Sequence, residues 1–259
     1  MKRCHAFEFN DYKIVPEFIR ESMPETLGMG LRWSKVYKAA APYFITFLKR
    51  TKAGRILDLA SGSGEPVSVL LESLKKEEKK SLRIILSDLY PNIPLMSQMA
   101  RRHPDHVSFI EKSLDATDIP DELDHDARLI ITAFHHFPPE RAARMLGGCV
   151  EKRSAIFILE PITRSLSSSY KLFFFVFMAI LCNPWMAQRH RLLKIIFTFF
   201  IPIIPCVFFW DSLISLLRIY TKEELTGMTA FSAGTYHWEY HEVPVPWRGR
   251  IQIYMGFPK

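Results

Sequence analysis

The residues best suited to chemistry follow a short apolar run near residue 60. Asp58 ends the run Arg55-Ile-Leu-Asp, and Gly62 and Gly64 follow it closely. Glycine has no Cβ and tolerates positive φ, so such a turn lets the backbone approach a ligand. In open α/β sheets, nucleotide-like ligands bind where a strand ends in such a turn and a helix begins. A lone glycine-rich loop is a weak signal, so its value depends on the residues that follow.

Further acids and histidines follow later apolar runs. Asp88 stands about two dozen residues after Gly64, where an acid can accept hydrogen bonds from ribose hydroxyls. His135 and His136 follow the fourth run, and histidine can accept a proton near neutral pH. Glu160 directly follows the fifth run. We expect these residues near one reactive centre.

The apolar runs predict the elements that position these residues. Five strands are expected at 55–58, 83–88, 107–110, 129–134 and 155–159, separated by loops and helices. This alternation indicates an α/β fold, a parallel sheet with helices on both faces. Two more strands are expected near 236–241 and 250–255, with Pro244 and Pro246 in the turn between them. A helix is expected after Thr221, because Glu224 completes a capping box.

With these features in place, the chain resembles the class I S-adenosylmethionine-dependent methyltransferases. The resemblance rests on Asp58-Leu-Ala-Ser-Gly-Ser-Gly64, Asp88, Asp115-Ala116 and Phe134-His-His-Phe137. It implies a seven-stranded, mostly parallel Rossmann-like sheet with one antiparallel edge strand. The cofactor-binding domain would comprise residues 45–164 and 220–259. The family usually has a third glycine where Ala60 stands, and alanine is small enough for the cofactor to fit.

The resemblance also implies S-adenosyl-L-methionine as cofactor and S-adenosyl-L-homocysteine as product. By position, Asp58 would orient the loop and approach the amino acid end of the cofactor. Asp88 would hold the ribose, and Asp115 and the backbone of Ala116 would meet the adenine. The full set expected to bind the cofactor is Asp58, Ala60, Gly62, Gly64, Asp88, Leu89, Asp115, Ala116 and Phe134.

Methyl transfer mainly requires that the nucleophile meet the methyl carbon in correct alignment. A general base helps where the nucleophile is a hydroxyl or an acidic carbon. His135 and His136 are the candidate bases, and Glu160 is the third catalytic candidate. Packing against the cofactor or a helix is the alternative role for the two histidines. The other histidines and the four cysteines lack the spacing of a ligand cluster, so we predict no metal site.

The residues before the first strand are expected to cover the cofactor pocket. Residues 1–44 read as a helical lid with breaks at Pro16, Pro24, Gly28 and Gly30. Tyr12, Trp33 and Tyr37 are expected to line this lid, and Tyr12 and Trp33 to contact substrate. Simple packing of these aromatic side chains is the alternative.

Residues 165–219 form a very apolar insert. Leu172–Cys182 is apolar without interruption, and Leu192–Trp210 is nearly so. A transmembrane helix needs about 20 apolar residues, which the first segment lacks, and prolines break the second. The other interpretations are a cap over an apolar substrate pocket, an extra helical layer, or an interfacial helix. The interfacial interpretation uses the polar stripe of Arg191, Lys194 and Thr198.

A second polar stripe lies at the end of the insert. Asp211, Ser215 and Arg218 share one face of an otherwise apolar helix. Polar groups in so apolar a region should be paired or face a cavity. We expect these three residues to bind substrate, with a structural link to the main domain as the alternative.

Charge and cysteine content bound the location and partners. The formal charge of +7 permits contact with anionic membrane surfaces or with RNA. The N-terminus has no apolar signal segment and the cysteines are scattered, which predicts a cytoplasmic protein. The insert adds the expectation of a peripheral contact at the inner face of the membrane. Nothing in the sequence predicts the oligomeric state.

The most consistent function is methyl transfer to a hydrophobic small molecule or lipid-like acceptor. RNA methylation is an alternative, but the fourth strand ends in Phe-His-His-Phe rather than in the Asn/Asp-Pro-Pro-aromatic motif of enzymes that methylate base amino groups. A basic patch interleaved with aromatic residues is also missing. A non-catalytic, membrane-associated protein that binds the cofactor is the other alternative.

Overall fold

In this computed structural model the strands form a seven-stranded sheet in the order β3-β2-β1-β4-β5-β7-β6. The structure describes residues 2–4, 6–9, 12, 14–34, 36–165, 177–185, 189–246 and 249–259. The first five strands run parallel, and β7 is antiparallel to both of its neighbours. The strands are β1 (Arg55–Asp58), β2 (Arg83–Leu86), β3 (Val107–Phe109), β4 (Ala127–Ile131), β5 (Ala155–Glu160), β6 (Tyr236–Val245) and β7 (Gly249–Pro258). The predicted fold class is confirmed.

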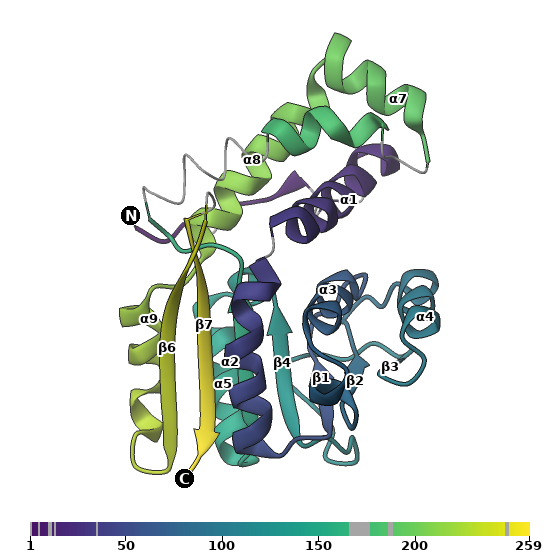
Figure 1. Ribbon diagram of the computed structural model, residues 1–259. Coiled ribbons are helices and arrows are strands. Elements are labelled where there is room, and N and C mark those ends of the chain that lie inside the picture. Colours follow the sequence, from purple (N-terminus) through teal and green to yellow (C-terminus); the bar gives the residue numbers. More distant parts are fainter. Residues whose placement is uncertain are drawn as a thin grey trace.

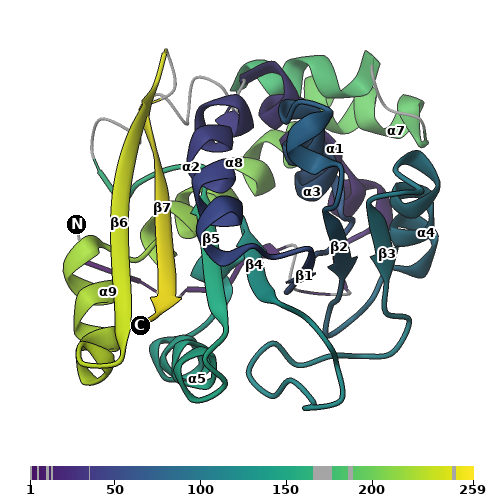
Figure 2. The ribbon, with the colours of Figure 1, turned by 60° about the horizontal axis from the view of Figure 1, so that its bottom comes forward.

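Helices cover both faces of the sheet, because its central strands are apolar on both sides. Every residue of β4 and β5 is buried. One face is covered by α2 (Val36–Thr51), α3 (Glu65–Ser73) and α4 (Ile93–Arg102). The other is covered by α5 (Pro139–Glu151) and α9 (Lys222–Thr229), as Figure 2 shows. The predicted capping box of Thr221 and Glu224 begins α9.

The N-terminal region is less broken than predicted. Helix α1 (Glu17–Ser34) begins directly after Pro16 but continues through positions 24, 28 and 30. An internal glycine costs about 1 kcal/mol and an internal proline about 3 kcal/mol, and packing of the helix can outweigh these costs. The predicted boundary at residue 44 falls inside α2. There Phe44 and Phe47 pack edge-on against Phe157 of β5, with ring centroids 5.1 and 5.5 Å apart.

The N-terminal segment and the insert form a helical layer beyond the carboxyl ends of the parallel strands (Figure 1). Ile19 of α1 packs with Ile204 and Val207 of α8 in a small apolar core of this layer. Residues 166–176 and 186–188, with the first part of the predicted segment Leu172–Cys182, lie outside the described residues. The layer contains α1, the helical residues 177–185, α7 (Arg191–Ile195), the π-helical turn η4 (Ile196–Phe200) and α8 (Ile203–Arg218).

Two of the three residues in the polar stripe of α7 and η4 are buried, whereas the interfacial interpretation needs the stripe at the surface. Lys194 and Thr198 are buried, with 0% and 4% of their surface exposed, whereas Leu192 and Phe200 are 70% and 77% exposed. Helical periodicity distinguishes two faces of a helix but does not say which one meets the rest of the protein. Here Lys194 and Thr198 pack inward, whereas Arg191 and the apolar side chains point outward.

Within the described residues, no single helix is long and apolar enough to cross a bilayer. The segments Arg191–Phe200 and Ile203–Arg218 reach that length and composition only together, and they meet at an angle of 80°.

The C-terminal hairpin differs from its prediction in two respects. The antiparallel strand β7 lies between β5 and β6, so the edge strand is β6. Pro244 lies within β6, opposite Arg250, rather than in the turn. Proline lacks an N–H and is tolerated in a sheet mainly on an edge strand, which is the position of β6.

The turn after β1 has three residues in left-handed conformation. Ala60, Gly62 and Gly64 have φ of 55°, 55° and 74°. A Cβ at Gly64 would lie 2.6 Å from Cδ1 of Leu86, so glycine is also required there for close packing. Ala60 takes a conformation that favours glycine, which explains why the resembled family has glycine at this position.

We predict that Ala60→Gly raises the free energy of unfolding by about 1 kcal/mol, because the left-handed conformation costs other residues about 1–2 kcal/mol. Urea denaturation would measure the difference. Gly64→Ala is the matched control and should destabilise the protein. An Ala60→Gly protein no more stable than the wild type would contradict the strain at Ala60.

Candidate functional site

The glycine-rich turn is tied to the end of β2 by Asp88. The backbone N–H of Gly62 donates a hydrogen bond to Oδ2 of Asp88 at 2.8 Å, and that of Tyr90 donates to Oδ1 at 2.9 Å. A Cβ built on Gly62 would meet no atom within 4 Å, so the outer side of the turn is open. Asp88 therefore holds the turn while its carboxylate stays partly exposed at the carboxyl edge of the sheet.

Two buried polar atoms beside this turn have no hydrogen-bond partner in the described part of the chain. They are Oδ1 of Asp58, at the end of β1, and the hydroxyl oxygen of Tyr37 in α2. Burial, with a further contribution from Asp88, raises the pKa of Asp58 to about 8, although Ser61 opposes the shift. Burial and the nearby charges of Glu160 and Asp58 also raise the pKa of Tyr37.

Unpaired buried polar groups are costly unless a ligand satisfies them. A carboxyl that can become negative and a hydroxyl donor match the positive amino group and the carboxylate of an amino acid. The surroundings of Asp58 and Tyr37 therefore fit the amino acid end of S-adenosylmethionine. Tyr37 was not among the cofactor residues predicted from the sequence.

The residues expected around the adenine lie next to one another. The backbone N–H of Leu114 donates to the carbonyl of Asp88 at 2.9 Å, which brings the segments after β2 and β3 together. Ser113 donates to the carbonyl of Leu89 at 2.6 Å. Ala116 is buried, with 7% of its surface exposed.

Asp115 has a protein partner that the sequence did not predict. Arg141 of α5 donates to both of its carboxylate oxygens, at 2.8 and 2.7 Å. Burial opposes ionisation, but hydrogen bonds from Thr117 and the Arg141 charge outweigh it and lower the pKa of Asp115. Asp115 is thus a fixed negative group.

His135 and Glu160 form a buried pair at the ends of β4 and β5. The backbone N–H of His135 donates to Oε1 of Glu160 at 2.9 Å, and its ring Nδ1 lies 2.9 Å from Oε2. Burial lowers the pKa of His135, but the Glu160 carboxylate outweighs this effect and raises it above the ordinary value. With Nδ1 engaged by Glu160, the ring nitrogen left for chemistry is Nε2.

His136 belongs to a second group of charges above this pair. Its ring centroid lies 4.2 Å from that of His135. Arg218 of α8 donates to Nδ1 of His136 at 3.0 Å and pairs with Oε1 of Glu8 at 2.9 Å. Ligand atoms of Glu8, His135 and His136 lie within 4.8 Å of one another, close enough to hold a metal ion. The sequence analysis predicted no metal site. In the structure, the guanidinium of Arg218 contacts both Glu8 and His136 and supplies a positive charge beside this group.

The three polar residues of α8 hold the N-terminal strap, which we define as residues 2–4 and 6–9. Asp211 accepts from the backbone N–H of Phe9 at 2.7 Å, and Ser215 donates to Oε1 of Glu8 at 3.0 Å. Arg218 donates to the carbonyl of Ala6 at 2.6 Å. These contacts correspond to the structural link that the sequence left open as an alternative to substrate binding.

The other predicted site residues lie in three different environments. Phe134 is 1% exposed and packs in the core, with its ring centroid 5.5 Å from that of Tyr220, so only its backbone can face a ligand. Tyr12 is about half exposed and packs edge-on against Phe7 of the strap. Trp33 is also about half exposed, near the end of α1.

The strap contributes residues that the sequence analysis missed. Glu8 is 4% exposed and lies against Arg218 and His136. Arg3 donates to the carbonyls of His135, at 3.3 Å, and of Phe137, at 3.1 Å. The sequence around Glu8, Phe7-Glu8-Phe9, matches no motif used above, so it gave no signal for a site residue.

No family model and no curated protein sequence matches this chain. Solved structures match it at low sequence identity. The plantazolicin methyltransferase BpumL, in complex with S-adenosylhomocysteine, has a TM-score of 0.59 and 12% identity over 96% of this chain and 93% of that one. The methyltransferase domain of bacterial CtHen1-C has a TM-score of 0.51 and 13% identity, covering 86% and 98%.

The mitomycin 7-O-methyltransferase MmcR matches with a TM-score of 0.51 and 15% identity over 88% of this chain, which spans 54% of that protein. At these identities the likeness concerns the fold. It confirms the resemblance seen in the sequence: the chain has the fold of the class I S-adenosylmethionine-dependent methyltransferases.

Proposed function

We propose that this protein transfers a methyl group from S-adenosylmethionine to a hydroxyl of a hydrophobic small molecule. The observation that carries the proposal is the buried pair of His135 and Glu160 at the carboxyl ends of β4 and β5. A hydroxyl acceptor needs a base to take its proton, whereas a neutral amine does not. The solved structures with this fold that are named above include an O-methyltransferase.

The cofactor would lie across the carboxyl ends of β1 and β2. Asp58 and Tyr37 would hold its amino acid end, and Asp88 its ribose, beside the open side of Gly62. When bound, S-adenosylmethionine supplies a methyl group on a sulfonium centre. Most of the rate gain would come from holding the acceptor oxygen in line with that group.

His135 would then act as the general base. The acceptor hydroxyl donates its hydrogen bond to Nε2 of His135, and the proton moves to that nitrogen as the oxygen attacks. The carboxylate of Glu160 fixes the ring through Nδ1 and stabilises the imidazolium that forms. Loss of this proton to solvent would return the site to its starting state.

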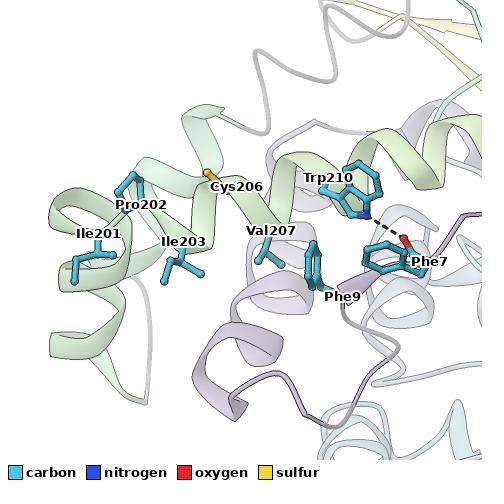
Figure 3. Close-up of a pocket in the computed structure, with 8 residues that line it drawn as sticks. All are labelled: Phe7, Phe9, Ile201, Pro202, Ile203, Cys206, Val207 and Trp210. Carbon is cyan, nitrogen blue, oxygen red and sulfur yellow. Dashed lines mark hydrogen bonds between the residues drawn. The ribbon is translucent and has the colours of Figure 1, made fainter.

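The helical layer supports an apolar acceptor. A cavity of about 500 Å³ lies between the strap and α8, with almost wholly apolar walls that include Phe7, Phe9 and Trp210 (Figure 3). The same helix ends at Arg218, beside His136. A hydrophobic acceptor therefore has apolar surface on the element that also borders the proposed base.

Release of S-adenosylhomocysteine by the purified protein tests the proposal. We expect release with a bacterial lipid extract and none with total RNA. Fractionation of the active extract would then identify the acceptor. Release with RNA alone would overturn the hydrophobic acceptor in favour of RNA methylation.

We predict that His135→Asn lowers kcat about 100-fold, within the range typical of a lost general base. An asparagine amide can still donate to Glu160 but cannot take the proton. Affinity for S-adenosylhomocysteine, measured by calorimetry, should stay within about twofold, because His135 is not among the assigned cofactor residues. Wild-type turnover in this variant would remove His135 from the mechanism.

The pH profile gives an independent test of the pair. A base must be unprotonated, and Glu160 raises the pKa of His135, so kcat should rise as the pH passes that raised value. Glu160→Gln removes the carboxylate and should move this rise to lower pH, with a lower maximum rate. A rise at the same pH in both proteins would show that another group titrates.

Asp58→Asn should stabilise the cofactor-free protein while weakening its binding of S-adenosylhomocysteine. The folded carboxyl keeps its proton up to about pH 8, whereas its ordinary pKa is 3.8. Wild-type stability therefore falls relative to the variant as the pH rises through that window, by about 1.4 kcal/mol per pH unit at most. Urea denaturation from pH 4 to 9 would measure the growing difference, and a constant difference would contradict the assignment.

A further inference from the structure

The insert differs from the rest of the chain in the sign of its charged residues. Residues 161–210 contain no aspartate and no glutamate, although acids are common before and after them. The charged residues within this stretch are all basic, and they include the exposed Arg191 and Arg189, of which Arg189 pairs with Glu17 of α1 at 3.7 Å. Such a surface repels cationic partners and attracts anionic ones.

The same part of the chain exposes a set of large apolar side chains, which we call the insert tip. Its members are at least 39% exposed although they belong to helical segments. They lie on α7, on η4, directly after η4 and at the start of α8, around the 80° bend between these segments. The insert tip consists of Leu192, Leu193, Phe199, Phe200, Ile201 and Ile203.

The insert tip faces away from the protein because the opposite sides of its helices are occupied. Phe197 packs against Phe18 of α1, with ring centroids 5.1 Å apart, and Lys194 and Thr198 are buried. Figure 1 shows α7 at the far side of the layer from the sheet. Contiguous exposed apolar surface of this kind marks an interaction site rather than ordinary surface.

We propose that the insert tip inserts into the headgroup boundary of an anionic lipid bilayer, from one side only. Apolar side chains bordered by basic ones match the apolar and anionic layers of that boundary. Crossing the bilayer is disfavoured because Asp211 and Arg218, in the second half of α8, are buried against the strap. The bent pair therefore presents its bend to the lipid and its other end to the sheet.

A second copy of this chain is a poorer partner for the insert tip. A symmetric contact would place the same surface on both sides, and so would bring Arg189 and Arg191 of both chains close together. Residues 161–210 contain no acid, and the acid that pairs with Arg189 is Glu17 of α1, at 3.7 Å. Anionic headgroups neutralise the same charges directly.

The proposal also places the open side of the apolar cavity next to the lipid. Ile201 and Ile203 belong to the insert tip and also line the cavity with Phe7, Phe9 and Trp210 (Figure 3). A hydrophobic acceptor dissolved in the bilayer would meet the cavity at this point. That step rests on the proposed function, whereas contact with lipid does not.

Sedimentation with vesicles tests lipid contact without cofactor or acceptor, so its result is separate from that of the activity assay. We expect the wild type to pellet with equimolar phosphatidylglycerol and phosphatidylcholine vesicles, and less with phosphatidylcholine alone. Leu192→Ser combined with Phe200→Ser should lower the partition coefficient about tenfold or more, because two apolar side chains are lost from the contact.

Phe231→Ser is the matched control for Phe200→Ser. Phe231 is 66% exposed but lies against α5, on another part of the molecule, and its replacement should change partitioning less than twofold. Circular dichroism would show that each variant keeps its fold. Equal pelleting of wild type, tip variant and control would overturn the proposal. The proposal would also be overturned if the wild type did not bind vesicles and instead formed a dimer that Phe200→Ser dissociates.

Discussion

The arrangement at the carboxyl ends of β4 and β5 depends on pairing the buried carboxylate of Glu160. Glu160 ends a strand whose residues are all buried, and its two oxygens are taken by the backbone and the ring of His135. A buried charge is tolerated only when it is paired and hydrogen-bonded. The pairing fixes the ring of His135 and joins the ends of β4 and β5. Above it, Glu8 and Arg218 form a second buried ion pair, which attaches the strap and the insert to the same place. The pairing of buried charges thus sets the proposed chemistry, through Glu160 and His135, and the position of the covering layer, through Glu8 and Arg218.

The parts of the fold predictable from sequence were those encoded by neighbouring residues. Asp58, the glycine turn and Asp88 form one hydrogen-bonded unit because each follows a short buried strand whose apolar run is visible in the sequence. Glu8 could not be identified in that way. Its partner Arg218 is more than two hundred residues away, and only the folded chain brings them together. Pro244 was misplaced because a proline signals a turn locally, whereas its place in a strand depends on β6 being at the sheet edge.

The insert shows a different limit of sequence reasoning. The spacing of Lys194 and Thr198 correctly indicated a polar helical face, but the direction of that face depends on what packs against it. Here α1 offers polar groups to the insert: the side chain of Asn183 donates to Thr26 at 2.8 Å and lies 3.4 Å from the carbonyl of Ser22. A helical layer with polar groups on its inner side can leave apolar side chains outside, which is the reverse of an ordinary soluble helix. The proposed lipid contact therefore rests on the exposed apolar side chains and Arg191, and not on Lys194 and Thr198 of the stripe.

The geometry of α8 connects the two proposals. Trp210 lines the apolar cavity and Arg218 contacts His136, and the eight helical steps from one to the other correspond to about 12 Å. An acceptor with its hydroxyl at His135 and its apolar part in the cavity would have to span about this distance beneath the strap. The strap is held to α8 by hydrogen bonds at Asp211 and Ser215 and by an ion pair at Arg218. These contacts are polar, whereas the cavity walls are apolar. Phe7 and Phe9 of the strap are themselves part of the cavity wall, and the carbonyl of Phe7 accepts a hydrogen bond from Nε1 of Trp210 at 3.0 Å. Movement of the strap along α8 would therefore disturb the polar pairs and the cavity together. In the proposed mechanism, Glu8 and Arg218 would govern access to His135, and the apolar residues farther along the helix would select the acceptor.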